Sequence, residues 1–141
     1  IISLDGNASL LFELYHNNRG YTKEERLNFY KAADQTLSTV QKKSALSDYQ
    51  KWVLAQYETW AMNRNYLLCS YSKSFREKYS AGFTTIAAED GSALTTLSGS
   101  YAISDYYLLD ISHRQYTGDE ESEFGNYYLS STTSLSLSST F

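Results

Sequence analysis

The chain changes character near Gly82, and this change constrains the fold more than any other feature. Residues 1–82 carry 11 of the 12 Lys and Arg residues, whereas residues 83–141 carry one and are rich in Ser and Thr. Before Gly82 the apolar residues recur at helical spacing, and after it short β-prone runs are bounded by turns. Helices followed by strands predict an α+β fold. In it, N-terminal helices, including a long antiparallel helical hairpin, pack on a small antiparallel β-sheet.

Three local signals define the expected helices. Apolar residues within 10–15 recur at helical spacing, and Gly20 is suited to end that helix. Residues 22–25 form a capping box, in which a hydroxyl and a carboxylate each satisfy a free backbone N–H at a helix start. A second capping box at 47–50 begins the other arm of the expected hairpin.

The segment 48–79 leaves two interpretations open. One unbroken helix would be about 48 Å long, at roughly 1.5 Å per residue. A compact domain of this length is only about 37 Å across, so such a helix would need a partner. The alternative is a break within 63–74, where serines alternate with larger residues at a strand-like period: Ser70, Tyr71, Ser72, Lys73, Ser74 and Phe75.

The sequence pattern of the second half of the chain predicts β-strands. The runs 83–86 and 93–97 flank a turn at 89–92 and predict a hairpin, and an acidic loop is expected at 117–126. The stretch 127–141 carries no charge and alternates Leu with Ser or Thr, which predicts a strand that is covered by a neighbour. We expect one domain, 1–141, with a helical layer (1–82) and a β layer (83–141). The start at Ile1 without Met suggests a processed chain or a fragment.

Composition excludes several function classes. The net charge of −4 argues against nucleic-acid binding, which needs a basic face. No run of 18 apolar residues is present, so no membrane-spanning helix is expected. The glycines fit neither a dinucleotide fingerprint nor a phosphate-binding loop, and His16 and His113 have no second ligand at metal-binding spacing. We therefore expect no cofactor.

The acidic loop offers the two weaker site hypotheses. Clustered carboxylates are ligands that Ca²⁺ prefers, although the EF-hand pattern is absent. The candidate metal ligands are Asp119, Glu120, Glu121 and Glu123. In addition, Glu121-Ser122-Glu123 resembles the Glu-x-Glu element of ADP-ribosyltransferases. The resemblance covers three residues and implies an enzyme that uses Glu121 and Glu123, with Glu123 contacting the nicotinamide ribose. The family's upstream Arg and its Ser-Thr-Ser strand have no counterpart here.

The favoured function is a non-enzymatic structural or assembly subunit of a virion, tail or extracellular appendage. It would self-associate, or dock on other protein subunits, through an aromatic helix face and a C-terminal strand. The predicted contact residues are Trp52, Tyr57, Trp60, Tyr71, Phe75, Leu135, Leu137 and Phe141. The alternative is a ligand- or carbohydrate-binding module that uses an aromatic stripe of Trp52, Tyr57, Trp60 and Tyr66.

Overall fold

The computed structural model describes residues 2–5, 7–41, 62–76, 78–125 and 129–139. The chain divides into two compact units. The sheet unit comprises Ile1–His16 and Asn65–Phe141, and the helical unit comprises Asn17–Arg64.

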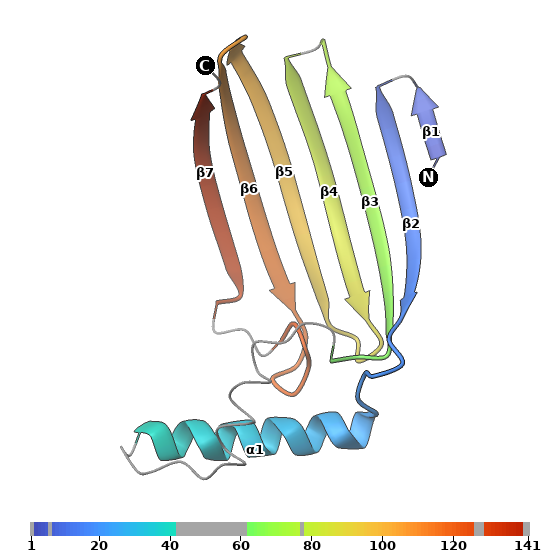
Figure 1. Cartoon of the computed structure of the whole chain (residues 1–141), viewed down its shortest axis with the longest axis vertical. Coiled ribbons are helices and arrows are strands. Elements are labelled where there is room, and N and C mark those ends of the chain that lie inside the picture. Colours follow the sequence, from blue (N-terminus) through green and yellow to red (C-terminus); the bar gives the residue numbers. More distant parts are fainter. Residues whose placement is uncertain (1, 6, 42–61, 77, 126–128, 140–141) are drawn as a thin grey trace. The chain divides into compact units, whose positions relative to one another are not determined.

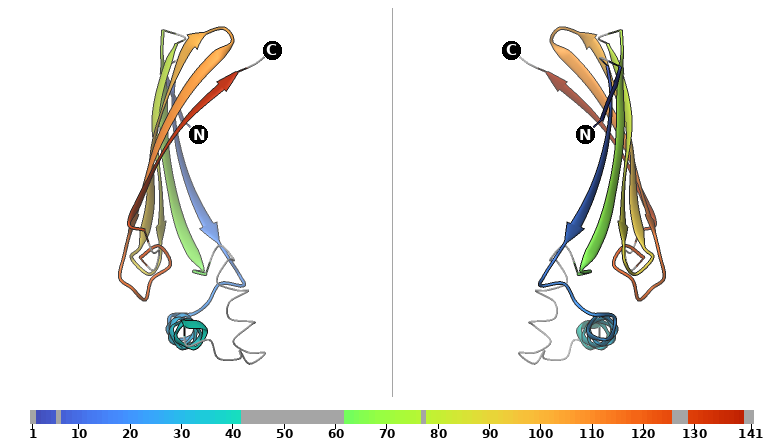
Figure 2. Two further views of the ribbon diagram at one scale, coloured as in Figure 1. Left: turned by 90° about the vertical axis from the view of Figure 1, so that its left-hand side faces the viewer. Right: turned by 90° about the vertical axis from the view of Figure 1, so that its right-hand side faces the viewer.

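The sheet unit is one antiparallel sheet of seven strands (Figure 1). Every strand pairs with its neighbours in the sequence, and Figure 2 shows the strands as a single twisted layer. The strands are β1 (Ile2–Asp5), β2 (Ala8–His16), β3 (Asn65–Phe75), β4 (Tyr79–Ala88), β5 (Ala93–Ser104), β6 (Tyr107–Thr117) and β7 (Ser131–Ser139).

Short turns join the central strands. Gly91, at a φ of 86°, occupies the left-handed conformation that the β4–β5 turn requires. Arg76 adopts a φ of 50° in the β3–β4 turn. Between β5 and β6 the register shifts by one residue at Ala102/Ser104, and the Tyr106 N–H donates to Ser104 Oγ at 3.2 Å. Long strands with tight connections therefore fix the register from β3 to β6.

The helical unit contains α1 (Lys23–Gln41) and begins with the predicted capping box. The Thr22 N–H donates to Glu25 Oε2 at 2.7 Å, and the Glu25 N–H donates back to Thr22 Oγ1 at 3.3 Å. The core of this unit consists of Phe29, Tyr30, Ala33 and Met62.

Backbone hydrogen bonds close the ends of the helical unit. The Asn17 N–H donates to the Arg64 carbonyl at 2.6 Å, and the Tyr21 N–H donates to the Met62 carbonyl at 2.7 Å. Gly20 lies between these bonds, where an added Cβ would sit 2.4 Å from the Asn63 carbonyl oxygen. Only a residue without a side chain fits there.

The predicted α+β fold with an N-terminal helical hairpin is wrong, because the described chain is mainly β. Residues 8–16 were expected to form a helix but form β2. The prediction failed because apolar residues lie on both faces of this strand, and together they imitate helical spacing. A continuous helix over 48–79 is also wrong, since β3 begins at Asn65. The break expected within 63–74 is confirmed. The second arm of the hairpin falls mostly within 42–61, outside the described residues.

Predictions for the second half of the chain fare better. The hairpin around 89–92 is confirmed as β4 and β5, and the terminal strand is confirmed over Ser131–Ser139. Gly82, however, lies inside β4, so the division into a helical and a β layer at this residue is wrong. In the described part of the chain, no helix has the length and apolarity needed to cross a membrane.

Candidate interaction surface

The register of the sheet divides its side chains into two unlike faces. Residues directly opposite each other on paired strands share a face, and successive residues along a strand alternate between faces. One face, here called the apolar face, carries Leu10, Phe12, Leu14, Leu67, Tyr71, Phe75, Tyr79, Phe83, Leu97, Tyr101, Leu109, Ile111, Leu135 and Leu137. The other, the hydroxyl face, carries Ser70, Ser72, Ser74, Ser80, Thr84, Thr96, Ser98, Ser100, Ser112, Thr132, Ser134, Ser136 and Ser138.

Large side chains of the apolar face form two ridges that run across the strands. The first ridge consists of Phe75, Tyr79, Tyr101, Leu109 and Leu137. The second ridge consists of Leu10, Tyr71, Phe83 and Leu97. The ridges are four residues apart along each strand, so they are separated by about 13 Å. Within them, the rings of Tyr79 and Tyr101 stack with centroids 4.8 Å apart, and those of Tyr71 and Phe83 lie 6.1 Å apart.

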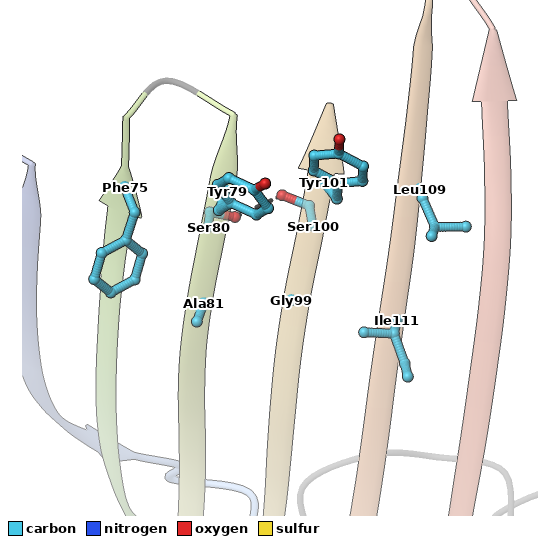
Figure 3. Close-up of a pocket in the computed structure, with 9 residues that line it drawn as sticks. All are labelled: Phe75, Tyr79, Ser80, Ala81, Gly99, Ser100, Tyr101, Leu109 and Ile111. Atoms are coloured by element: carbon cyan, nitrogen blue, oxygen red, sulfur yellow. Dashed lines mark hydrogen bonds between the residues drawn. The ribbon is translucent and has the colours of Figure 1, made fainter. Parts of the chain in front are cut away.

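A trough lies between the two ridges, because Ala81 and Gly99 face each other on β4 and β5. Beside the first ridge the trough opens into a shallow hollow of about 360 Å³ (Figure 3). Phe75, Tyr79 and Tyr101 stand over one side of the hollow, and Ile111 lies on β6 beside Gly99. The small residues of the trough are confined to β4 and β5, because Lys73 on β3 and Ile111 on β6 lie in the same row as Ala81 and Gly99.

Much of the apolar face is exposed to solvent. The exposed fraction is 53% for Leu97, 50% for Tyr79 and 69% for Leu135. Soluble monomers rarely leave a contiguous apolar patch of this kind uncovered. The apolar face thus has the properties of an interaction surface.

The apolar face is nearly free of charge. Lys73 is its single Lys or Arg among the described strand positions, and the ammonium lies 5.4 Å from the centre of the Phe75 ring. Among the described positions of β2 to β7, no Asp or Glu lies on this face, and Asp5 of β1 pairs with Ala8 at its edge. Beyond the second ridge the face becomes polar on β4 to β6, with Thr85, Thr95 and Gln115 side by side. In contrast, β2 and β3 remain apolar there, with Phe12, Leu14 and Leu67.

The hydroxyl face is different in chemistry. Its Ser and Thr side chains are small, and they bond to one another across the strands. Ser80 and Ser100 lie 2.6 Å apart between their hydroxyl oxygens, and Ser112 and Ser134 lie 2.8 Å apart. These hydroxyls satisfy each other at the surface, so the Ser- and Thr-rich part of this face has no need of an apolar partner. The same face also carries larger apolar side chains: Leu11, Leu68, Ile86, Leu108 and Tyr116.

A loop after β6 closes one end of the hydroxyl face. The Asp90 carboxylate accepts from the backbone N–H groups of Ser92 and Glu123, both at 2.9 Å, and so ties the β4–β5 turn to this loop. The Phe124 N–H donates to Ser92 Oγ at 3.2 Å. Tyr66, Ala88, Leu94 and Phe124 are the buried apolar residues at this end.

The acidic residues proposed as metal ligands or catalytic groups lie in this loop. The Glu123 carboxylate accepts from the Tyr66 hydroxyl at 2.6 Å, whereas Asp119, Glu120 and Glu121 are exposed. Within the ranges that the structure describes, no three His, Cys, Asp or Glu side chains are placed to hold a metal ion. Glu123 thus anchors the loop to β3.

The predicted contact residues divide into two groups. Tyr71, Phe75, Leu135 and Leu137 come from β3 and β7, and the register brings all four onto the apolar face. Tyr71 and Phe75 were expected on a helix, which is wrong because both lie in β3. Trp52, Tyr57, Trp60 and Phe141 lie outside the described residues.

Sequence reasoning missed most of the apolar face. The residues not singled out include Tyr79, Phe83, Leu97, Tyr101 and Ile111. Their signal is the period of two in β4 and β5, where apolar residues alternate with Ser, Thr and Gly. Comparisons with protein-family models, with curated proteins and with solved structures find no match for this chain.

Proposed function

We propose that this chain is a non-enzymatic structural subunit that self-associates through the apolar face of its sheet. The observation that supports this proposal most is the separation of the two faces. Exposed aromatic and aliphatic side chains gather on one face, while the opposite face carries hydroxyls that bond to one another.

A second copy of the chain is the partner that this face suits best. Two sheets pack face to face about 10 Å apart when side chains of one interdigitate with those of the other. The rings of Tyr79 and Tyr101 of one copy would then lie over the small residues Ala81 and Gly99 of the other. A two-fold axis places the same surface on both sides, which a nearly uncharged face tolerates without repulsion.

The solution mass of the full chain tests this proposal. At tens of micromolar, light scattering is expected to give a mass at least twice the 16.1 kDa of one chain. A monomer at that concentration would overturn the proposal. A monomer that binds phosphatidylcholine vesicles would also overturn it, and would assign the apolar face to a lipid surface.

A further inference from the structure

The outer edge of β7, the last strand of the sheet, has no partner strand among the residues that the structure describes. The Tyr116 N–H donates to the Ser130 carbonyl at 2.9 Å, which fixes the alternation of hydrogen bonds along β6 and β7. Even-numbered residues of β7 bond toward β6. Odd-numbered residues therefore direct their N–H and C=O groups outward: Ser131, Thr133, Leu135, Leu137 and Ser139.

This edge lacks the features that usually prevent strand pairing. Natural edge strands are short, or carry Lys, Pro or inward-pointing charges. All nine residues of β7 are exposed, and none is charged or Pro. The opposite edge of the sheet is protected, because the four-residue β1 covers the start of β2 and Glu13 follows on β2.

We propose that β7 pairs with β7 of a second copy, antiparallel and about a two-fold axis. This inference rests on the proposed function, since it adds a second interface to the same assembly. In an antiparallel contact about a two-fold axis, the residue on the axis meets its own copy, and every other residue meets one at an equal distance on the far side of the axis. Because no residue of β7 is charged, no register of this pairing places like charges opposite each other.

The hydrogen-bond alternation restricts the register. Outward residues must pair with outward residues, so odd-numbered positions face odd-numbered positions. The register that pairs all nine residues puts Leu135 on the two-fold axis and Thr133 opposite Leu137. Both leucines lie on the apolar face, and this face therefore continues without a break into the second copy.

The two interfaces together predict a closed assembly. The axis of the β7 contact is perpendicular to the sheet, whereas the axis of the face-to-face contact lies parallel to it. When the face-to-face axis crosses the strands at the level of Leu135, it intersects the axis of the β7 contact, and two perpendicular two-fold axes that intersect generate a tetramer with D2 symmetry. The full chain is therefore expected at a mass near four times 16.1 kDa.

A proline substitution tests the edge without touching the β6–β7 ladder. Thr133→Pro removes an outward N–H, and proline is tolerated on an edge strand where its nitrogen faces away from the sheet. Thr133 Oγ1 also lies 2.8 Å from His113 Nδ1, so Thr133→Ala, which loses only that contact, is the matched control. We expect Thr133→Pro to halve the mass by light scattering and Thr133→Ala to leave it unchanged. Equal masses for wild type and the folded Thr133→Pro variant would contradict the edge contact.

Disulfide trapping gives a second readout that does not depend on the proline variant. In a Cys69→Ser background, Leu135→Cys places two thiols on the two-fold axis, at the separation of a directly opposed pair, about 5.5 Å between Cα atoms. Oxidation should yield a covalent dimer on a non-reducing gel. Ser134→Cys is the control, because its thiol faces Ser136 of the second copy and not itself. Failure of Leu135→Cys to cross-link beyond the level of Ser134→Cys would also overturn the pairing.

The outcomes separate the edge from the face. If only the edge proposal fails, Thr133→Pro leaves the mass unchanged, and substitutions on the apolar face still reduce it. If only the face proposal fails, the wild type is a dimer, Thr133→Pro gives a monomer and face substitutions have no effect.

Discussion

Replacing Leu97 by Thr is expected to weaken self-association by about one to two orders of magnitude. Leu97 lies in the second ridge and is 53% exposed, so about half of its surface remains to be covered by a partner. Full burial of a leucine contributes about 1.5–3 kcal/mol, so the covered half contributes about 0.8–1.5 kcal/mol per copy. Two copies meet at an isologous interface, and the loss is then about 1.5–3 kcal/mol. This corresponds to roughly a 10- to 150-fold increase in Kd.

The matched control is the same substitution on the opposite face. Leu108 is 38% exposed and lies on the hydroxyl side of β6, so Leu108→Thr removes a comparable side chain from outside the interface. Threonine keeps the β propensity of both positions. Sedimentation velocity over a dilution series, with circular dichroism to verify folding, measures the effect. Equal shifts in Kd for Leu97→Thr and Leu108→Thr would refute the assignment of the interface to the apolar face.

Three further predictions concern local structure. Gly20→Ala should destabilise the helical unit by about 1–3 kcal/mol in urea unfolding, because its Cβ would meet the Asn63 carbonyl; an unchanged midpoint would argue against that close approach. The pKa of Glu25 is lowered from 4.5 by hydrogen bonds, first from the backbone N–H of Thr22 and then from the Thr22 hydroxyl. The ionised Glu25 carboxylate therefore stabilises the helix fully above pH 4.5, and this stabilisation is lost as the pH falls through the lowered pKa. An NMR titration of the Thr22 amide checks this, and a midpoint at or above 4.5 would contradict it. Asp90→Ala should free the loop after β6 and raise amide exchange at Glu123, whereas unchanged protection would show that other contacts hold the loop.

Local signals predicted the parts of the fold that depend on neighbouring residues. The Thr22 and Glu25 capping box correctly placed the start of α1, since both partners lie within four residues. The β4–β5 hairpin was also correct, because its turn residues and flanking strands are contiguous in the sequence. Such contacts can be predicted without knowledge of the tertiary fold.

The helical interpretation of 8–16 and 65–79 failed for a physical reason. A strand that carries large residues on both faces, as β2 does with Leu10 and Leu11, shows apolar residues at every spacing. The register then decides which of them share a face. The pairing of Leu10 with Tyr71 joins residues 61 positions apart, and no local pattern specifies it. Tyr71 and Leu135 were therefore predicted as interface residues from their residue types alone. That they lie on one face of the same sheet was not predicted.

The connection between β2 and β3 has a consequence for how the sheet assembles. The strands from β3 to β6 join through short turns and can form as successive hairpins at low cost in loop-closure entropy. In contrast, the pairing of β2 with β3 must close a loop of 48 residues, from Asn17 to Arg64. The Asn17–Arg64 and Tyr21–Met62 backbone bonds bring the two ends of that insertion together. Formation of the helical unit thus brings β2 close to β3 and lowers the entropy cost of their pairing. Destabilising this unit at Gly20 should therefore slow the pairing of β2 with β3 more than the formation of the hairpins from β3 to β6.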